Sequence, residues 1–252
     1  MQGFRQAVRG GSVLLGTFIK TASHQVPELL GAAGLDFAIV DAEHAPFDAP
    51  TLDRMVAASR MPLLVRVPEL APAPIGQALD LGAAGVVVPH VASADLATKA
   101  LKAAKYRLRA RGYSPSTRAG GYGTRGSYLT AADQESAVWV QIEDAAALAD
   151  LDAIAAVDEI DCLFIGRADL ALSLGVDGPR HPKVAEAVKA TAAAGRRARR
   201  TVGIFTNDTG ELPELVALGV TVFVHGSDQS LMLAEAKRVK SAFFTATAAR
   251  RQ

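Results

Sequence analysis

Three ionisable residues close an apolar run in the first fifth of the chain. The segment Phe37 to Phe47 reads FAIVDAEHAPF, and its apolar part stops at Asp41, Glu43 and His44. A strand that is buried on both faces rarely ends in such a cluster unless it faces a polar pocket. A histidine, whose ordinary pKa is about 6.5, can act as an acid/base group near neutral pH. The segment therefore indicates the rim of an active site.

Two further acidic residues, Glu143 and Asp169, each follow an apolar run. On adjacent parallel strands they would meet at one point, where paired carboxylates either share a proton or hold a hard divalent cation. We favour the metal, because Arg66 supplies a positive donor and no Cys or His cluster offers the softer ligands of zinc. The structural alternative is that Glu143 caps a helix beginning at Asp144 and that Asp169 caps the helix LALSLG.

Eight short β-type apolar runs alternate with alanine- and leucine-rich segments of helical spacing. The predicted strands are Ser12–Ile19, Phe37–Asp41, Leu63–Val67, Gly85–Pro89, Ala137–Ile142, Cys162–Ile165, Val202–Phe205 and Val222–His225. The predicted helices include Thr51–Ser59, Ala94–Lys105, Ala145–Ala155, Val184–Ala198 and Leu212–Leu218. Apolar strands that alternate with helices are expected to be parallel and covered on both faces.

This α/β pattern predicts a single domain over residues 1–252, folded as a (β/α)8 TIM barrel. A doubly wound sheet is the alternative, but no G-x-G-x-x-G turn follows the first strand. A barrel would gather its chemistry at the C-terminal ends of its strands. Polar or glycine residues stand at those ends, namely Asp41, Glu43, His44, Arg66, His90, Gln141, Glu143, Gly166, Asp169, Thr206, Asn207, His225, Gly226 and Ser227.

Composition narrows the choice of partner. The formal net charge is +1, so no overall attraction draws the chain to nucleic acid or to an anionic membrane. The single cysteine, Cys162, lies in an apolar run and is predicted to be a small core residue. No export signal and no membrane span are recognised, which predicts a soluble, cytoplasmic protein with a small-molecule substrate.

An ordered series of motifs resembles the HpcH/HpaI aldolase family, which contains class II, metal-dependent 2-oxoacid aldolases such as 4-hydroxy-2-oxoheptanedioate aldolase and 2-dehydro-3-deoxyglucarate aldolase. The motifs are Asp41-Ala-Glu-His44, Val65-Arg66-Val-Pro68, Val88-Pro89, Gln141-Ile-Glu143 and Gly166-Arg-Ala-Asp169-Leu170. The match runs from about Gly16 to Lys240. The resemblance implies a lyase that makes or cleaves the C3–C4 bond of 4-hydroxy-2-oxoacids, with an aldehyde as the second partner.

The resemblance also implies roles for single residues. Glu143 and Asp169 would bind Mg²⁺ or Mn²⁺, with Co²⁺ as another candidate, and the metal would chelate pyruvate or hydroxypyruvate and favour its enolate. Arg66 would stabilise the charge on the ketone oxygen. The substrate carboxylate would be held by Gln141 and by the backbone at Gly166 and Ala168.

The remaining implied roles concern proton transfer and water. His44 would be the base for the 4-hydroxyl group, while Asp41 and Glu43 would anchor metal-bound waters. The family pairs its histidine with an aspartate in a phrase like the one at Asp80, yet Asp80 is predicted to lie on the helix before strand four, near the bottom of the barrel. We therefore expect Asp80 to reach His44 across a subunit contact or through a displaced loop. A surface aspartate is the structural alternative.

Three more features set expectations. Arg167 departs from the small residue usual in the family and is expected to point to solvent and pair with a nearby acid, although a role beside the substrate carboxylate stays open. The loop from Tyr106 to Gly126 is long enough to need a purpose, and the resemblance suggests that it lines the site near a neighbouring subunit. The helix after Asp228 is similar to an exchanged final helix, which implies a homo-oligomer in the form of a trimer-based hexamer.

Two other mechanisms compete with the metal-dependent aldolase. A Schiff-base aldolase needs a lysine at a strand end, and only Lys20 comes close to such a position. An acyl-CoA lyase or oxoacid decarboxylase on the same barrel is the other alternative. A coenzyme A site would require a basic patch around the mouth of the barrel, where the strands end, and the sequence shows no decisive one.

Overall fold

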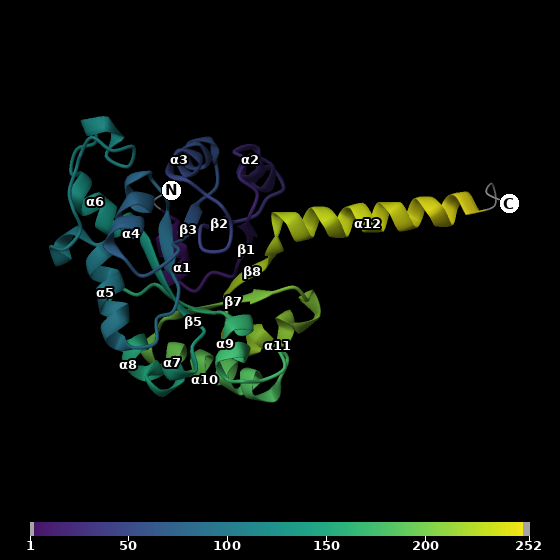
Figure 1. The fold of residues 1–252 in the computed structure, drawn as a ribbon. Helices are drawn as coiled ribbons and strands as arrows, with labels where there is room; N and C mark the ends of the chain where they lie inside the picture. The colour runs from purple at the N-terminus through teal and green to yellow at the C-terminus, as the bar shows by residue number, and fades with distance from the viewer. Residues whose placement is uncertain (1–2, 249–252) are drawn as a thin grey trace.

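One closed parallel barrel organises the chain. The computed structural model describes residues 3–248, and its strands follow one another around the barrel in sequence order (Figure 1). Strand β1 closes the ring by pairing with β8, where Leu14 lies opposite Val222. The predicted (β/α)8 fold is therefore confirmed.

The strands agree closely with the predicted runs. They are β1 (Leu14–Ile19), β2 (Phe37–Asp41), β3 (Leu63–Arg66), β4 (Gly85–Val88), β5 (Ala137–Ile142), β6 (Cys162–Ile165), β7 (Thr201–Thr206) and β8 (Val222–Ser227). The first strand starts later than predicted, and the last two strands extend further along the chain.

Helices surround this barrel on the outside. They are α1 (Phe4–Arg9), α2 (Gln25–Ala32), α3 (Ala49–Ala58), α4 (Pro72–Asp80), α5 (Ala94–Ala104), α6 (Tyr128–Glu135), α7 (Ala145–Ala149), α8 (Leu151–Ala156), α9 (Arg167–Ser173), α10 (Pro182–Ala198), α11 (Leu212–Ala217) and α12 (Asp228–Thr247), with short 3-10 turns at Tyr106–Leu108, Gly121–Gly123 and Thr209–Glu211. The predicted helix over 145–155 is wrong in one respect, because it breaks at Asp150. The Asp150 side chain accepts the N–H of Ala94, which anchors the break to α5.

Alternate residues of the strands fill the barrel interior. The interior cluster contains Phe18, Phe37, Ile39, Leu64, Val87, Trp139, Cys162, Phe164, Val222 and Val224. Cys162 is a buried core residue, as predicted. The strand residues that point outward pack against the helices in a second layer, which covers the outer face of most strands, whereas Leu15 on the outside of β1 is exposed.

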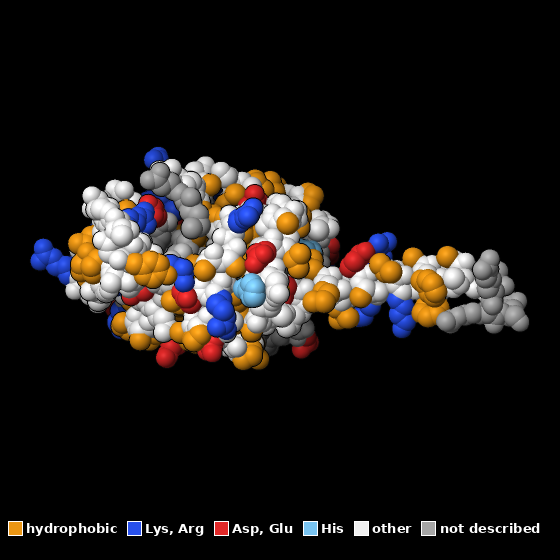
Figure 2. Space-filling view, turned by 90° about the horizontal axis from the view of Figure 1, so that it is seen from above, with side chains coloured by type: hydrophobic (Ala, Val, Ile, Leu, Met, Phe, Trp, Pro, Cys, Tyr) orange, Lys and Arg blue, Asp and Glu red, His pale blue; other side chains and the backbone are white. Residues whose placement is uncertain are grey.

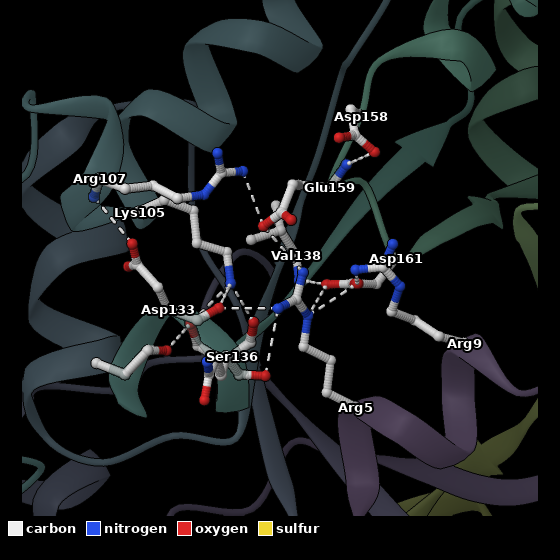
Figure 3. A network of polar contacts seen from close by, with 12 residues as sticks. Arg5, Arg9, Lys105, Arg107, Asp133, Ser136, Val138, Asp158, Glu159 and Asp161 are labelled. Atoms are coloured by element: carbon white, nitrogen blue, oxygen red, sulfur yellow. Dashed lines mark hydrogen bonds and ion pairs between the residues drawn. The ribbon is translucent and has the colours of Figure 1, made fainter. Parts of the chain in front are cut away.

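Helix α1 closes the bottom of the barrel, where the strands begin. Phe4 and Val8 join the interior cluster, and the Phe4 ring lies 5.7 Å from that of Phe37. Beside them Arg5 reaches a group of polar residues that joins α1 to α6 and to the start of β6 (Figure 3). This helix was not predicted, yet it seals the end of the barrel opposite the candidate site.

Helix α12 leaves the barrel instead of packing on it (Figure 1). Its exposed apolar side chains run along the protruding rod in Figure 2, and they are Leu231, Met232, Leu233, Val239, Phe243 and Phe244. Over residues 3–248, no helix combines the length and the apolar character needed to cross a membrane.

Candidate active site

The carboxylate of Glu143 lies at the end of β5 and is almost fully buried. Its Oε1 accepts the backbone N–H of His90 at 2.8 Å, and its Oε2 accepts a hydrogen bond from Gln141 Nε2. A Cβ added at Gly166 would lie 2.7 Å from Oε2, so the close approach of β6 to this carboxylate requires glycine. The structure thus brings Gln141, Glu143 and Gly166 together, as predicted.

Asp169 lies in the first turn of α9, directly after β6, and is close enough to influence Glu143. Burial raises the pKa of Glu143, and the negative charge of Asp169 raises it further, against the hydrogen bonds from His90 and Gln141. The alternative that both residues are helix caps is wrong. Helix α7 has Asp144 as its N-cap and α9 has Gly166, and the N–H of Ala145 at the start of α7 donates to Ser173 Oγ and not to Glu143. Ala168 is exposed in the same turn as Asp169.

Across the mouth, Asp41 sits between two cations at the ends of β1, β2 and β3. Arg66 Nε donates to Asp41 Oδ1 at 3.0 Å, and its Nη2 lies 2.8 Å from Oδ2. Lys20 Nζ lies 3.1 Å from the same Oδ2. Burial alone would raise the pKa of Asp41, but Arg66, the N–H of His44 and Lys20 outweigh it and hold the pKa below its usual range. Asp41 is therefore a buried carboxylate ion.

His44 and Glu43 stand at the rim beside this group. The side chain of His44 is 51% exposed, its Nε2 is 3.7 Å from Glu43 Oε2, and its backbone N–H donates to Asp41 at 3.1 Å. Glu43 Oε2 is also 3.2 Å from Arg66 Nε but has no hydrogen-bond partner in the described part of the chain. The predicted base is thus open to solvent and next to the predicted oxyanion donor.

An aromatic layer forms the floor below these polar groups. The Phe18 ring contacts the rings of Phe164 and Phe205, with centroids 6.3 and 5.7 Å away. The Arg66 guanidinium lies 4.7 Å above the Phe18 ring, which fixes it at the level of the carboxylates. A charged arginine on an apolar floor has few water molecules to compete with a substrate oxygen.

The sequence matches a known protein family over most of its length. A model of the HpcH/HpaI aldolase/citrate lyase family matches residues 14–234. The chain belongs to this family. The family predicted from the motifs is therefore confirmed, and with it the prediction of an aldolase, which is a carbon–carbon lyase.

Individual relatives cover nearly the whole chain. A hydroxypyruvate/pyruvate aldolase from Roseobacter denitrificans is 33% identical over 243 residues, which is 94% of each chain. A 4-hydroxy-2-oxovalerate aldolase from Rhodococcus jostii is 34% identical over 248 residues, which is 96% of each. Among solved structures, an HpcH/HpaI aldolase/citrate lyase family protein from Burkholderia cenocepacia has a TM-score of 0.91 at 32% identity and covers 96% of this chain and 99% of that one.

Asp80 does not lie with the other predicted residues of the HpcH/HpaI site. It is the last residue of α4, and its carboxylate accepts from Arg111 Nη2 at 2.6 Å and from the Tyr106 hydroxyl at 3.4 Å. Within residues 3–248 no hydrogen bond or ion pair joins it to His44. Asp80 and Arg111 line a cavity of about 750 Å³ between α4 and the loop that follows α5.

Arg167 pairs with an acid, as expected, but it does not point to solvent. Its guanidinium donates to both carboxylate oxygens of Glu211, at 2.8 and 2.6 Å, and to the carbonyl of Phe205 at 3.0 Å. Glu211 also accepts a hydrogen bond from Thr206 Oγ1. The Arg167–Glu211 pair therefore joins the first turn of α9 to the loop after β7. The Arg167 side chain is only 15% exposed.

The donor set at the mouth suits a divalent cation. With histidines counted as neutral, the carboxylates of Asp41, Glu43, Glu143 and Asp169 exceed the two cations Lys20 and Arg66 by two negative charges. Gln141 Oε1 and Glu43 Oε2 are buried oxygens without a hydrogen-bond partner among the described residues, whereas Asp41 Oδ2 is held by Lys20 and Arg66. No group of three or more His, Cys, Asp or Glu in residues 3–248 forms a complete protein ligand set. The arrangement fits a hard cation whose other ligands are water and substrate.

Sequence reasoning gave no role to His90, which stands against the same carboxylates. Its Nδ1 lies 3.5 Å from Glu143 Oε1 and 3.3 Å from Asp144 Oδ2. Partial burial would lower the pKa of His90, but Glu143, Asp144 and Glu43 outweigh it and raise the pKa. Its backbone adopts a left-handed conformation (φ 54°), which sets the N–H toward Glu143. The Val88-Pro89 motif marked the place, but the turn conformation could not be read from it.

Proposed function

We propose that this protein is a divalent-metal-dependent aldolase that joins or separates pyruvate, or hydroxypyruvate, and an aldehyde at the C3–C4 bond of a 4-hydroxy-2-oxoacid. The observation that carries the proposal is the arrangement of charge across the mouth. Glu143 and Asp169 form an anionic half, while Lys20 and Arg66 flank Asp41 in the opposite half. A 2-oxoacid that binds between the halves presents its oxygens to both. Relatives named as hydroxypyruvate/pyruvate aldolases support this choice of donor.

Glu143 and Asp169 would hold Mg²⁺ or Mn²⁺, which supplies Lewis-acid polarisation of the ketone when it is bound. Arg66 would face the ketone oxygen and stabilise its developing negative charge, because burial on Phe18 keeps water away from its guanidinium. Gln141 would orient the substrate carboxylate together with the backbone at Gly166 and Ala168. Asp41, beside its ion pairs with Lys20 and Arg66, and Glu43, through its free Oε2, would order water molecules.

His44 would take the proton from the 4-hydroxyl group during cleavage and return it to the aldehyde oxygen during addition. Its exposed ring and its place beside Glu43 support this role. We further propose that Asp80 of a neighbouring copy completes the pair with His44, since Asp80 in its own chain faces a cavity on the outside of the barrel. Replacing Asp80 by Asn would then lower the rate of the aldol step without changing the affinity for the oxoacid.

Both competing mechanisms lack comparable support. A Schiff-base lysine must be neutral to attack a ketone, whereas Lys20 is paired at 3.1 Å with a buried carboxylate ion. A coenzyme A site would want free cations near the mouth, whereas Arg167 and Arg180 are paired with Glu211 and Asp208. Borohydride treatment with pyruvate should therefore leave no covalent adduct on the protein.

The deciding experiment is a screen of 4-hydroxy-2-oxoacids for pyruvate release by protein stripped with a chelator. We expect no turnover in the stripped protein and recovery on addition of Mg²⁺, Mn²⁺ or Co²⁺. Glu143→Gln should abolish this recovery, while the exposed Glu186→Gln on α10 serves as a matched control and should behave as wild type. Turnover that is indifferent to chelation would reject the metal-dependent mechanism.

We also propose a homo-oligomer, a trimer-based hexamer in which α12 is exchanged between copies. Its side chains Leu231, Met232, Leu233, Val239 and Phe243 are exposed, and so are Val13 before β1 and Leu15 on the outside of β1. A second copy of α12 has the length and apolar character to cover them. Light scattering should give a mass several times the chain mass of 26.3 kDa, and Leu233→Asp should shift the distribution toward smaller species. A wild-type monomer at micromolar concentration contradicts the assembly.

A further inference from the structure

Two different carboxylates hold Lys20, the residue that directly follows β1. Its backbone N–H donates to Asp228 Oδ1 at 2.8 Å, while its Nζ lies 3.1 Å from Asp41 Oδ2. The side chain is 31% exposed, whereas Asp41 is fully buried. Asp228 therefore holds the backbone of Lys20, and Asp41 holds its ammonium group at the mouth of the barrel.

Asp228 is the first residue of α12 and is itself buried. Its second oxygen accepts the N–H of Thr21 at 3.2 Å, so both oxygens bind the start of the loop after β1. A capping box between Ser227 and Ser230 fixes the first turn of the same helix. The direction in which α12 leaves the barrel is thus linked to the place of Lys20.

From Lys20 the contacts continue into the site. Asp41 accepts from Arg66 Nε at 3.0 Å and from the N–H of His44 at 3.1 Å, so the Lys20 ammonium shares this carboxylate with both residues. Lys20, Asp41, Arg66 and Glu43, whose Oε2 lies 3.2 Å from Arg66 Nε, carry no net charge together. Without Lys20 the group would carry a net charge of −1, and Arg66 alone would face both carboxylates. The ability of Arg66 to attract a substrate oxygen would then fall.

We propose that Lys20 and Asp228 are positioning residues that couple the seat of α12 to the charge and geometry of Asp41 and Arg66. Lys20 offsets the negative charge that Asp41 and Glu43 place around Arg66, which leaves Arg66 able to attract an anionic 2-oxoacid, and Asp228 keeps the backbone of Lys20 in place. This inference rests on the proposed function, because it concerns the same mouth. It adds that the first turn of the protruding helix is part of the machinery that orients the oxoacid.

Kinetics of the metal-loaded oligomer test the coupling. Lys20→Met keeps the length of the side chain and removes its charge, and we expect it to raise KM for the oxoacid and to lower kcat/KM by roughly tenfold to a hundredfold. Lys20→Arg restores the charge and should recover most of this loss. Asp228→Ala should change the same two parameters in the same direction. The matched controls are Lys102→Met, on the exposed side of α5, and Asp95→Ala, in the first turn of α5, and both should behave as wild type.

The double variant separates a coupled pair from two independent effects. If Asp228 acts through Lys20, Lys20→Met combined with Asp228→Ala should be no worse than Lys20→Met alone. Losses that multiply, or a Lys20→Met enzyme with wild-type KM and kcat, overturn the proposal. Should Asp228→Ala fail to fold, Asp228→Asn is the replacement, since it keeps one acceptor and loses the charge.

Hydrogen exchange gives a readout that does not depend on turnover. The amides of Lys20 and Thr21 should exchange faster in Asp228→Ala than in wild type, and they should be unchanged in Asp95→Ala. Faster exchange in Asp228→Ala, together with a wild type that cleaves no oxoacid, would reject the proposed function and leave the structural link intact. An active wild type with unchanged exchange and multiplicative losses would sink the link alone.

Discussion

The two ends of the barrel use buried charge in opposite ways. At the bottom, a cluster formed by Arg5, Lys105, Asp133, Glu159 and Asp161 satisfies the polar groups at its centre (Figure 3). Arg5 Nε donates to both oxygens of Asp161, at 2.9 and 3.0 Å, and the N–H of Val138 donates to one of them at 2.8 Å. At the mouth, by contrast, Glu43 and Gln141 each keep a buried oxygen without a hydrogen-bond partner in the described chain.

This difference in hydrogen bonding distinguishes residues that stabilise the fold from residues that are positioned to bind a ligand. A buried polar atom without a partner costs stability, so a chain keeps several of them together only where a ligand completes the set. The bottom cluster is complete within the chain and joins α1 to the barrel wall. Substitutions at the bottom should therefore change stability and spare chemistry, whereas substitutions at the mouth should do the reverse.

The largest expected effect is on chemistry, from Glu143→Gln. Loss of one of two proposed metal ligands should lower kcat/KM by about a thousandfold or more, or roughly 4 kcal/mol. Stability should not fall with it. Because the pKa of Glu143 is raised above its ordinary value of 4.5, folding is favoured by the neutral acid. This contribution is present below pH 4.5 and is lost as the pH rises through the raised pKa.

Glutamine removes that pH dependence. In metal-free buffer at pH 7, Glu143→Gln should unfold at the same temperature as wild type or higher, and Mn²⁺ should raise the melting temperature of wild type alone. Differential scanning fluorimetry with and without Mn²⁺ measures both effects. A variant that is less stable than wild type without metal would assign Glu143 to the fold and erase the contrast between the two ends.

Arg5→Met tests the bottom cluster. It leaves Asp161 buried without its cation, and breaking such a pair typically costs about 3–5 kcal/mol in the free energy of unfolding. Activity per folded molecule should not change. Arg9→Met is a matched control, because Arg9 is 39% exposed and its nitrogen is 3.7 Å from the same carboxylate, so its loss should cost less than about 1 kcal/mol. Urea unfolding at fixed protein concentration compares the three, and equal effects of both substitutions would contradict the assignment.

Lys105 gives the bottom cluster a pH signature. Its Nζ donates to the carbonyls of Asp133 and Ser136 at 2.8 and 2.5 Å, and burial, aided by the charge of Arg5, lowers its pKa from 10.5 to about 8. Between these values the unfolded chain binds more protons than the folded one, so stability rises with pH. Relative to Lys105→Met, wild type should gain about 3 kcal/mol between pH 7.5 and 10.5. A difference that stays flat over this range would show that the ammonium is not penalised by the fold.

The contrast also explains what the sequence could predict. Strand ends are local features, so the apolar runs that stop at Asp41, Arg66 and Glu143 located the mouth of the barrel and most of its charges. The family motifs then supplied roles for these residues. The bottom cluster could not be predicted in this way, because Arg5 and Asp161 are separated by 156 positions and follow no periodic pattern.

Three features of the site escaped prediction for the same reason. Lys20 was considered only as a nucleophile, although its contacts with Asp41 and Asp228 make it part of the polar network. The partner of Asp80, Arg111, lies in a long loop whose path the sequence does not reveal. The N–H of His90 reaches Glu143 through a left-handed backbone conformation, which is uncommon for residues other than glycine. Each feature depends on a contact between distant segments or on a turn, and neither is encoded in hydrophobic periodicity.

The smallest expected effect on activity comes from substitution of Arg167, whose charge is paired although it lies near the mouth of the barrel. Its bidentate contact with Glu211 resembles the pairs of the bottom cluster, so Arg167→Met should behave mainly as a stability variant, with a loss of about 1 kcal/mol for a partly buried pair. Metal affinity should stay unchanged, since Arg167 contacts the loop after β7 and not Glu143. The loosened loop should change the relative kcat/KM for short and long aldehydes by only a few-fold. Titration calorimetry with Mn²⁺ and a paired aldehyde assay check both, and a large fall in metal affinity would place Arg167 among the residues that shape the metal site instead.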